Sequence, residues 1–186
     1  MTRLRRTFAV LALSVIALGV AAQPAGAVTV TQANTYISVK QQSGTVGPVV
    51  LDVKLASKDD RAVVQLWTNG NGSHQRWQIT RLLNFNSDVA WYQFKNINSG
   101  KCLDASMDTA AHNGTPVYQY TCSDSPNQVW QWERRQPGDN WGFLVNLWGN
   151  LCLDGTGGST GNGTPLQLWA CNEDDSSNYH QRFNPF

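Results

Sequence analysis

One order of short motifs occurs three times along the chain. Each copy contains a Leu-Asp element, then a glutamine at or near an aromatic residue, and then a Gln-x-aromatic element. The last of these recurs every 53 residues, beginning at Gln75, Gln128 and Gln181. Self-similarity at a fixed period of about this length indicates a fold built from three similar structural units.

Short β-branched and aromatic stretches fill each copy, separated by Gly, Asn, Asp and Pro, without a sustained 3.6-residue period. This pattern is typical of strands. Twelve strands are expected, four in each unit, starting near Thr35, Val49, Val63, Arg76, Trp91, Cys102, Pro116, Val129, Trp141, Leu151, Pro165 and Gln181. The units would span about 35–82, 91–135 and 141–186. Because such small units cannot each bury an apolar face alone, they are expected to share one core as a closed all-β threefold barrel.

The N-terminal segment differs from the rest of the chain. Arg3, Arg5 and Arg6 precede an uninterrupted apolar run from Phe8 to Val20, and Ala25-Gly26-Ala27 follows. The run is too short for a membrane-spanning helix. Residues 1–27 are therefore predicted to be a secretory signal peptide, and residues 28–186 a single secreted, extracellular domain that is a monomer.

The charge balance excludes two classes of partner. Without the three arginines of the predicted signal peptide, 11 Lys and Arg face 13 Asp and Glu, and no basic run or stripe remains. A surface of this kind does not attract a phosphate backbone or an anionic lipid head group. Neither nucleic acid nor a membrane is expected as a partner, and no cofactor is expected.

Four cysteines occur in the second and third units, at Cys102, Cys122, Cys152 and Cys171. An even number in an exported chain indicates disulfides and not a metal site. If Cys102 bonds Cys122 and Cys152 bonds Cys171 as opposed residues of antiparallel strands, the same register sets an acid across from an aromatic ring. The first unit has no cysteine but keeps this spacing. The three expected pairs are Asp52 with Trp67, Asp104 with Tyr120, and Asp154 with Trp169.

An acid beside an exposed ring has the chemistry that binds a sugar. The ring offers a flat face to the C–H face of a pyranose, and the carboxylate accepts charge-assisted hydrogen bonds from neighbouring hydroxyls. The alternative for a single copy is an Asp that bonds its local turn and a ring that belongs to the core. Three copies of the same pair favour the sugar site.

The aromatic residue of each Gln-x-aromatic element is given a structural role. Trp77, Trp130 and Phe183 stand at one repeat position, where large apolar side chains are expected to form a shared core. The preceding glutamines either bond at the rim of that core or orient the acids.

These elements resemble those of the ricin-B-type trefoil lectins, including the trefoil carbohydrate-binding modules attached to bacterial glycanases. The resemblance covers about residues 35–186. It implies a β-trefoil with up to three shallow sugar pockets, each with an acid, a stacking ring, an Asn-like donor and a glutamine. It also implies galactose- or xylose-containing glycans as ligands.

Carried over by position, the resemblance assigns four residues to each pocket. The middle unit matches most fully, with Asp104, Tyr120, Asn127 and Gln128. The first unit supplies Asp52, Trp67, His74 and Gln75, and the third supplies Asp154, Trp169, His180 and Gln181. Histidine replaces the Asn donor in these two units, so binding there is expected to change near pH 6 to 7.

Two other functions are alternatives to a non-catalytic lectin. The sequence lacks the His-Glu-x-x-His motif of metal-dependent hydrolases. A glycoside-acting enzyme needs two carboxylates across one bond, whereas these acids belong to separate repeats. A trefoil protease inhibitor needs one protruding loop and has no use for three acid and aromatic pairs. A carbohydrate-binding protein without catalytic activity is the function expected from the sequence.

Overall fold

The computed structural model describes residues 28–42, 47–82, 90–173 and 177–186, with no account of the side chains of 28–34. The predicted signal peptide, 1–27, lies outside the described residues. Within the described part of the chain, no helix is both long and apolar enough to cross a membrane. The regular structure there consists of strands and single 3-10 turns.

The described residues form thirteen strands, so the expected number of twelve is not confirmed. The strands are β1 (Val28–Thr35), β2 (Ser38–Val39), β3 (Val49–Val53), β4 (Val64–Thr68), β5 (Trp77–Leu82), β6 (Trp91–Asn96), β7 (Cys102–Ala105), β8 (Thr115–Tyr120), β9 (Trp130–Arg134), β10 (Gly142–Asn146), β11 (Cys152–Gly155), β12 (Thr164–Trp169) and β13 (Phe183–Asn184). Strands β2 to β13 each start within three residues of an expected start. The additional strand is β1, which precedes the motifs of the first unit. Its Val and Thr residues favour an extended chain, and it pairs antiparallel with β5.

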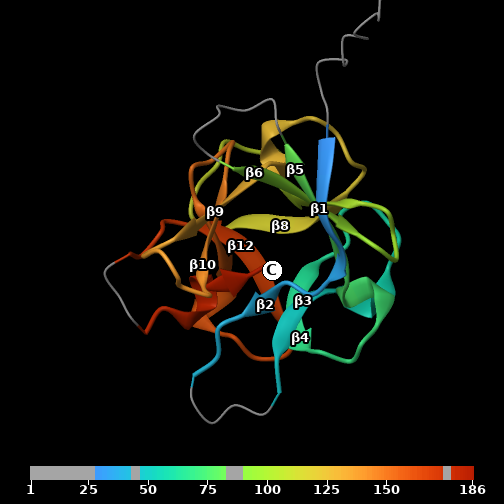
Figure 1. Ribbon diagram of the computed structural model, residues 1–186. Coiled ribbons are helices and arrows are strands. Elements are labelled where there is room, and N and C mark those ends of the chain that lie inside the picture. The colour runs from blue at the N-terminus through green and yellow to red at the C-terminus, as the bar shows by residue number, and fades with distance from the viewer. Residues whose placement is uncertain (1–27, 43–46, 83–89, 174–176) are drawn as a thin grey trace, which may run out of the picture.

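All thirteen strands belong to one sheet that closes on itself (Figure 1). Three antiparallel hairpins, β3–β4, β7–β8 and β11–β12, carry the Leu-Asp elements. Strand β12 also pairs with β4 and with β8, so the three hairpins are joined to one another. Strand β9 pairs with both β6 and β10. This closure leaves few open strand edges and gives the hairpins a fixed mutual arrangement.

The interior contains the residues to which the sequence assigned a structural role. Trp77, Trp130 and Phe183 are fully buried in one hydrophobic core. The indole Nε1 of Trp77 donates to the carbonyl of Leu51 over 3.3 Å, and that of Trp130 donates to the carbonyl of Leu103 over 3.1 Å. Each of these two indoles is thus tied to the strand that carries the Leu-Asp element of its unit, beside the acid.

Both expected disulfides are present. Cys102 bonds Cys122 with a Cα–Cα distance of 5.0 Å, and Cys152 bonds Cys171 with a Cα–Cα distance of 5.1 Å. The second cysteine of each pair lies beyond the end of its strand, since β8 ends at Tyr120 and β12 ends at Trp169. The disulfides therefore join the start of one strand to the loop that leaves the next.

The expected register is wrong by two residues in all three hairpins. Cys102 lies opposite Tyr120 and not opposite Cys122, because the disulfide reaches past the end of the ladder. Each acid consequently faces a different residue from the one expected. The observed pairs are Asp52 with Gln65, Asp104 with Tyr118, and Asp154 with Gln167. A shift of two residues keeps a side chain on the same face of the sheet, so the expected rings remain on the face of the acids.

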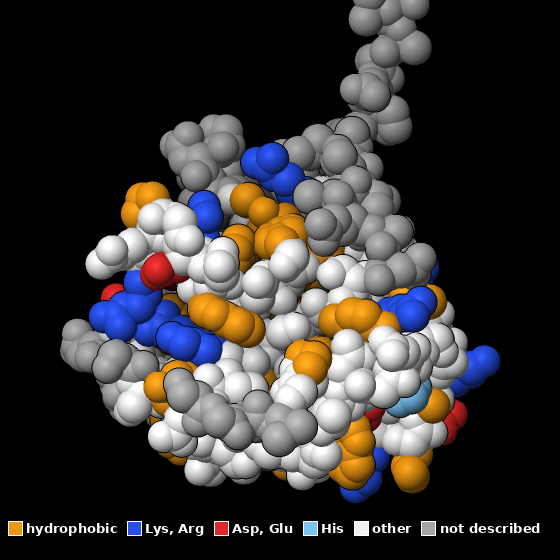
Figure 2. Space-filling model, turned by 60° about the horizontal axis from the view of Figure 1, so that its bottom comes forward, with side chains coloured by type: hydrophobic (Ala, Val, Ile, Leu, Met, Phe, Trp, Pro, Cys, Tyr) orange, Lys and Arg blue, Asp and Glu red, His pale blue; other side chains and the backbone are white. Residues whose placement is uncertain are grey.

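The last ring of each hairpin remains at the surface. Trp67, Tyr120 and Trp169 are 43%, 40% and 42% exposed. Tyr120 and Trp169 are the last residues of β8 and β12, and Trp67 is the last but one of β4. On the face shown in Figure 2, hydrophobic side chains are scattered among polar ones and form no continuous sheet. Single exposed apolar side chains are common on soluble proteins, so the informative feature is that the three rings share one position near the end of a hairpin strand.

Candidate functional site

Each Leu-Asp acid is held by the glutamine of its own unit. The Nε2 atoms of Gln75, Gln128 and Gln181 donate to one carboxylate oxygen of Asp52, Asp104 and Asp154 over 2.9, 2.7 and 2.8 Å. Both partners of every pair are buried. A buried carboxylate is costly without such a donor, so the pair accounts for the presence of an acid beside the core.

The same glutamines are also bound to the loop that follows each hairpin. Their Nε2 atoms donate to the carbonyls of Thr68, Thr121 and Ala170, and their Oε1 atoms accept from the backbone N–H of Gly70, Ser123 and Asn172. Both N–H groups of each amide are thus occupied within the protein. Of the two roles left open by the sequence, this geometry favours orientation of the acid.

The middle unit differs from the other two at the position opposite the acid. In the first unit Gln65 donates to the second oxygen of Asp52 over 3.0 Å, and in the third unit Gln167 donates to that of Asp154 over 2.8 Å. The middle unit has Tyr118 at this position, which offers no amide. The Asp104 carboxylate therefore has fewer internal donors than the other two acids.

The histidines of the first and third units also contact their acids. His74 Nε2 lies 3.2 Å from Asp52, and His180 Nε2 lies 3.5 Å from Asp154. Asn127 holds the corresponding place in the middle unit, where its Nδ2 donates to the carbonyl of Ala105 over 2.8 Å. Its Oδ1 is buried and has no hydrogen-bond partner among the described residues. An amide oxygen left in this state is a candidate acceptor for a ligand hydroxyl.

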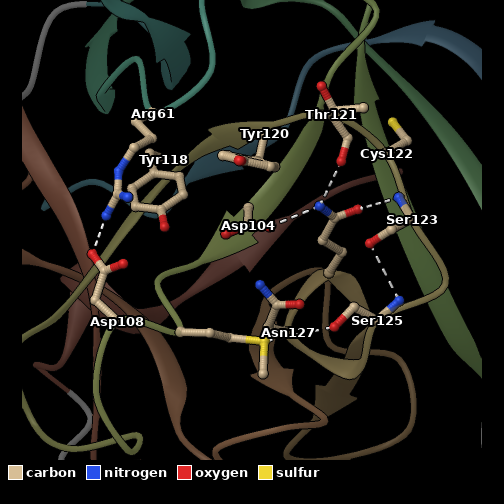
Figure 3. Close-up of a pocket in the computed structure, with 12 residues that line it drawn as sticks. Arg61, Asp104, Asp108, Tyr118, Tyr120, Thr121, Cys122, Ser123, Ser125 and Asn127 are labelled. Carbon is tan, nitrogen blue, oxygen red and sulfur yellow. Dashed lines mark hydrogen bonds and ion pairs between the residues drawn. The ribbon is translucent and has the colours of Figure 1, made fainter.

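A pocket of about 440 Å³ opens over Asp104 (Figure 3). Tyr118 and Tyr120 form one wall, and Asn127 lies on the other side. Met107 also lines the pocket. Arg61 reaches this pocket from the loop between β3 and β4, where it forms an ion pair with Asp108. Its guanidinium also lies 5.3 Å from the centre of the Tyr118 ring. The pocket thus combines two acids, two aromatic rings and a cation that is paired with one of the acids.

Several residues of this pocket were missed from the sequence. Arg61, Met107, Asp108, Tyr118 and Ser125 line it but belong to none of the repeated motifs. Gln65 and Gln167 were also missed as partners of the acids. A signal for these two was present, since each stands two residues before an exposed Trp and must share its face of the strand.

The first unit has a smaller pocket of about 340 Å³, in which Asp52, Trp67, His74 and Gln75 come together with Leu55. In the third unit the hydrogen bonds bring together Asp154, Gln181 and Gln167, with His180 beside the acid and Trp169 exposed at the end of β12. In these two units the structure therefore gathers the expected residues, with a glutamine opposite the acid where a ring was expected.

Burial raises the pKa of Asp104 to about 6, and the hydrogen bonds from Gln128 and Asn127 offset only part of this effect. Burial also raises the pKa of Asp154, against the hydrogen bonds from Gln167 and Gln181. By contrast, the Ser106 hydroxyl and the Arg61 guanidinium lower the pKa of Asp108. The middle pocket therefore contains one acid that titrates near neutral pH and one that stays ionised.

Three hairpins joined in one closed sheet, each with an acid, an oriented glutamine and an exposed ring, form an all-β arrangement consistent with a β-trefoil. Residues 82–169 match the family model described as "Ricin-type beta-trefoil lectin domain-like". The resemblance to the ricin-B-type β-trefoil lectins is thereby confirmed.

Solved structures share the fold. The chain is 26% identical to a designed threefold-symmetric protein, ThreeFoil, over 80% of this chain and 95% of that one, with a TM-score of 0.65. An exo-β-1,3-galactanase from Clostridium thermocellum is 24% identical over 84% of this chain and 30% of its own, with a TM-score of 0.66. A ricin B-like lectin from Macrolepiota procera, solved in complex with lactose, is 19% identical over 84% and 97%, with a TM-score of 0.55. Comparison with curated proteins gives no match.

Proposed function

We propose that the protein is a secreted carbohydrate-binding protein without catalytic activity, built from three repeats at about 35–82, 91–135 and 141–186. The observation that carries this proposal is the acid held by a buried glutamine beside an exposed ring, present in each of three hairpins. Three similar sites on one protein can bind a ligand that is itself built from repeating units, such as a polysaccharide. The similarity to ricin-type lectin domains supports the same function.

The middle pocket is proposed to bind most tightly. Asp104 has Tyr118 opposite it, so no second glutamine competes with a sugar hydroxyl for its carboxylate. The acids of the other units each accept from two glutamines and lie beside a histidine. A ligand at those units must replace internal hydrogen bonds, which lowers the net gain in free energy.

Galactose- or xylose-containing glycans are the proposed ligands, with Tyr120 against the sugar ring and Asp104 and Asn127 bonded to its hydroxyls. One shallow pocket of this kind is expected to bind a monosaccharide with a Kd of about 1 mM, or about −4 kcal/mol. Two or three pockets that engage one polymer together raise the overall affinity well above that of one pocket.

Retention of residues 28–186 on insoluble galactan, xylan and cellulose tests the proposal, together with calorimetric titration of galactose and xylose. Retention on galactan or xylan, with millimolar affinity for the free sugar, is the expected result. The variant Tyr120→Ala, which removes an exposed ring, is expected to reduce retention, whereas Tyr92→Ala removes a ring outside the pockets and serves as its control. Absence of binding to all three polymers and both sugars would contradict the proposal.

Sugar binding at the middle pocket is expected to weaken as the pH falls through about 6. The neutral carboxyl is a poorer acceptor than the carboxylate, and a group with a pKa of about 6 is about one-tenth ionised at pH 5. Titrations of galactose or xylose at pH 7.5 and pH 5.0 should therefore show a loss of up to about tenfold. Asp104→Asn serves as the control. This variant should bind the sugar more weakly, and its affinity should lack the part of the pH dependence that comes from Asp104.

Protonation of Asp104 has the opposite effect on folding. Since the pKa in the folded protein lies above the ordinary value of 3.8, the folded state takes up the proton more readily than the unfolded state. The contribution of Asp104 to the free energy of unfolding is therefore largest below the ordinary pKa and is lost as the pH rises through about 6.

For the sugar titrations, a wild-type affinity that stays constant from pH 7.5 to 5.0 would argue against a contact between the Asp104 carboxylate and the sugar.

A further inference from the structure

A basic recess lies apart from the three hairpin pockets. It has a volume of about 370 Å³ and is lined by Lys40, Arg135, Gln136, Asp139, Trp141 and Arg182. Lys40 follows β2, Arg182 precedes β13, and the other four belong to the connection between β9 and β10. Figure 2 shows basic side chains gathered on one flank of the molecule. The chain as a whole is nearly neutral, so a recess with three cations is a local feature of the surface.

Arg182 is the most unusual member of the recess. Its side chain is only 5% exposed, and its guanidinium lies 3.7 Å from the centre of the Phe143 ring. Neither Nη atom has a hydrogen-bond partner among the described residues, and both atoms are buried. A buried cation without an acceptor is costly, and native proteins supply one from the chain, from water or from a ligand.

The corresponding position of the first repeat is satisfied within the protein. Arg76 also stands between the glutamine and the ring of a Gln-x-aromatic element. Its Nε donates to the hydroxyl of Tyr36 over 2.8 Å, and its guanidinium lies over the Tyr36 ring. The middle repeat has Val129 there, so the fold does not require an arginine at this position. The unsatisfied guanidinium is therefore particular to the recess.

The acids near the recess do not neutralise it by direct contact. In the described part of the chain, no ion pair joins Lys40, Arg135 or Arg182 to a carboxylate. The Asp139 carboxylate accepts instead from the backbone N–H of Gln136 over 3.2 Å. Asp139 and Glu173 influence Arg182 only through longer-range attraction. Lys40 faces the ring of Tyr179, with its Nζ 5.4 Å from the ring centre. The three cations thus leave room for an added anion.

Trp141 adds a flat apolar surface to these charges. Its half-buried indole lines the same recess as the three cations. A guanidinium matches the two oxygens of a carboxylate or sulfate, and an indole face matches the C–H face of a sugar ring. One ligand that carries both parts is an acidic sugar unit.

We propose that this recess binds an acidic sugar unit, with its carboxylate or sulfate group on Arg182 and Lys40 and its ring against Trp141. The protein would then hold a charged polysaccharide at a fourth site, in addition to the hairpin pockets. This inference rests on the proposed function for the saccharide part of the ligand. Arg135 is proposed to attract the anion from the open side of the recess, because its side chain is exposed.

Titration of the 28–186 chain at low ionic strength tests the inference, with sodium glucuronate, glucose and sodium acetate as probes. The readout is the NMR signal of the Trp141 indole N–H, assigned with Trp141→Phe. Glucuronate is expected to shift this signal in a saturable way and to bind at least tenfold more tightly than acetate, while glucose leaves it unchanged. The double variant Lys40→Ala/Arg135→Ala is expected to bind glucuronate at least tenfold more weakly than the wild type.

A matched control is Lys58→Ala/Arg81→Ala, which removes two exposed cations that do not line the recess. It should bind glucuronate as the wild type does. Neither double variant changes the buried Arg182, so the comparison does not depend on a substitution in the core. An unmoved indole signal, equal affinity for acetate and glucuronate, or equal weakening in both double variants would overturn the inference.

The same samples separate this inference from the proposed function. If glucuronate does not shift the indole signal but neutral glycans still bind at the Tyr120 pocket, only the recess fails as a site. If glucuronate binds and the double variant weakens it, while no neutral glycan binds, the recess stands and the hairpin pockets lose their proposed role.

Discussion

Replacement of Asp104 by alanine is expected to weaken binding of a galactose- or xylose-containing glycan at the middle pocket by about 10- to 100-fold, since a hydrogen bond to a charged group is worth about 1.5 to 3 kcal/mol. The substitution removes the ionised acceptor while Gln128 keeps its bonds to Thr121 and Ser123, so the loop around the pocket is retained. Calorimetric titration of the free sugar measures the loss.

The matched controls are Asp52→Ala and Asp154→Ala. These acids accept internal hydrogen bonds on both oxygens, so their removal should change sugar affinity less than removal of Asp104. Circular dichroism of the three variants shows whether each keeps its fold. An Asp104→Ala protein that is folded and binds sugar as tightly as the wild type would exclude the middle pocket from the function.

Replacement of Trp130 by alanine is expected to lower the free energy of unfolding by about 3 to 5 kcal/mol, the usual cost of removing a large buried ring from a packed core. Trp130 is fully buried, and its indole also donates to the carbonyl of Leu103. The substitution therefore leaves a cavity and an unpaired carbonyl beside the strand that carries Asp104. Urea denaturation followed by fluorescence measures the change.

Tyr120→Ala is the contrasting variant, because it removes a ring of similar size from the surface. Its free energy of unfolding should change by less than about 1 kcal/mol, since surface substitutions outside special features are usually mild. Its sugar affinity should fall, while a folded Trp130→Ala protein should keep most of its affinity. If Tyr120→Ala unfolds as readily as Trp130→Ala, the separation of core rings from ligand rings is wrong.

The repeat pattern predicted much of this fold because the same requirement acts three times. A glutamine that must satisfy a buried acid and a ring that must fill the core recur at equal spacing, and that spacing is visible in the sequence. The disulfide partners followed from the same spacing. The extra strand β1, which pairs antiparallel with β5, was missed because it lies before the repeats.

The strand register could not be derived from the cysteines. A disulfide constrains two Cα atoms to be close, and this condition is met both by opposed residues and by a residue in the loop beyond a strand. The structure has the second arrangement. The error moved the partner of each acid by two positions, which hid Gln65 and Gln167 as hydrogen-bond donors.

The presence of Arg61 in the middle pocket also could not be predicted from the repeats. Arg61 belongs to the connection between β3 and β4, whereas Asp104 belongs to β7 in the next hairpin. Their proximity depends on how neighbouring hairpins pack, and internal similarity carries no information on contacts that differ between repeats. Asp108 pairs with Arg61 for the same reason.

This ion pair makes the middle site a joint product of two segments that are 47 positions apart. A fragment excised around residues 91–135 would carry Asp104, Tyr120 and Asn127 but would lack the cation that neutralises Asp108. Transplanting the binding specificity into another trefoil would therefore require donor loops from two successive repeats. Natural exchange of single repeats would alter recognition at the boundary as well as within the exchanged segment.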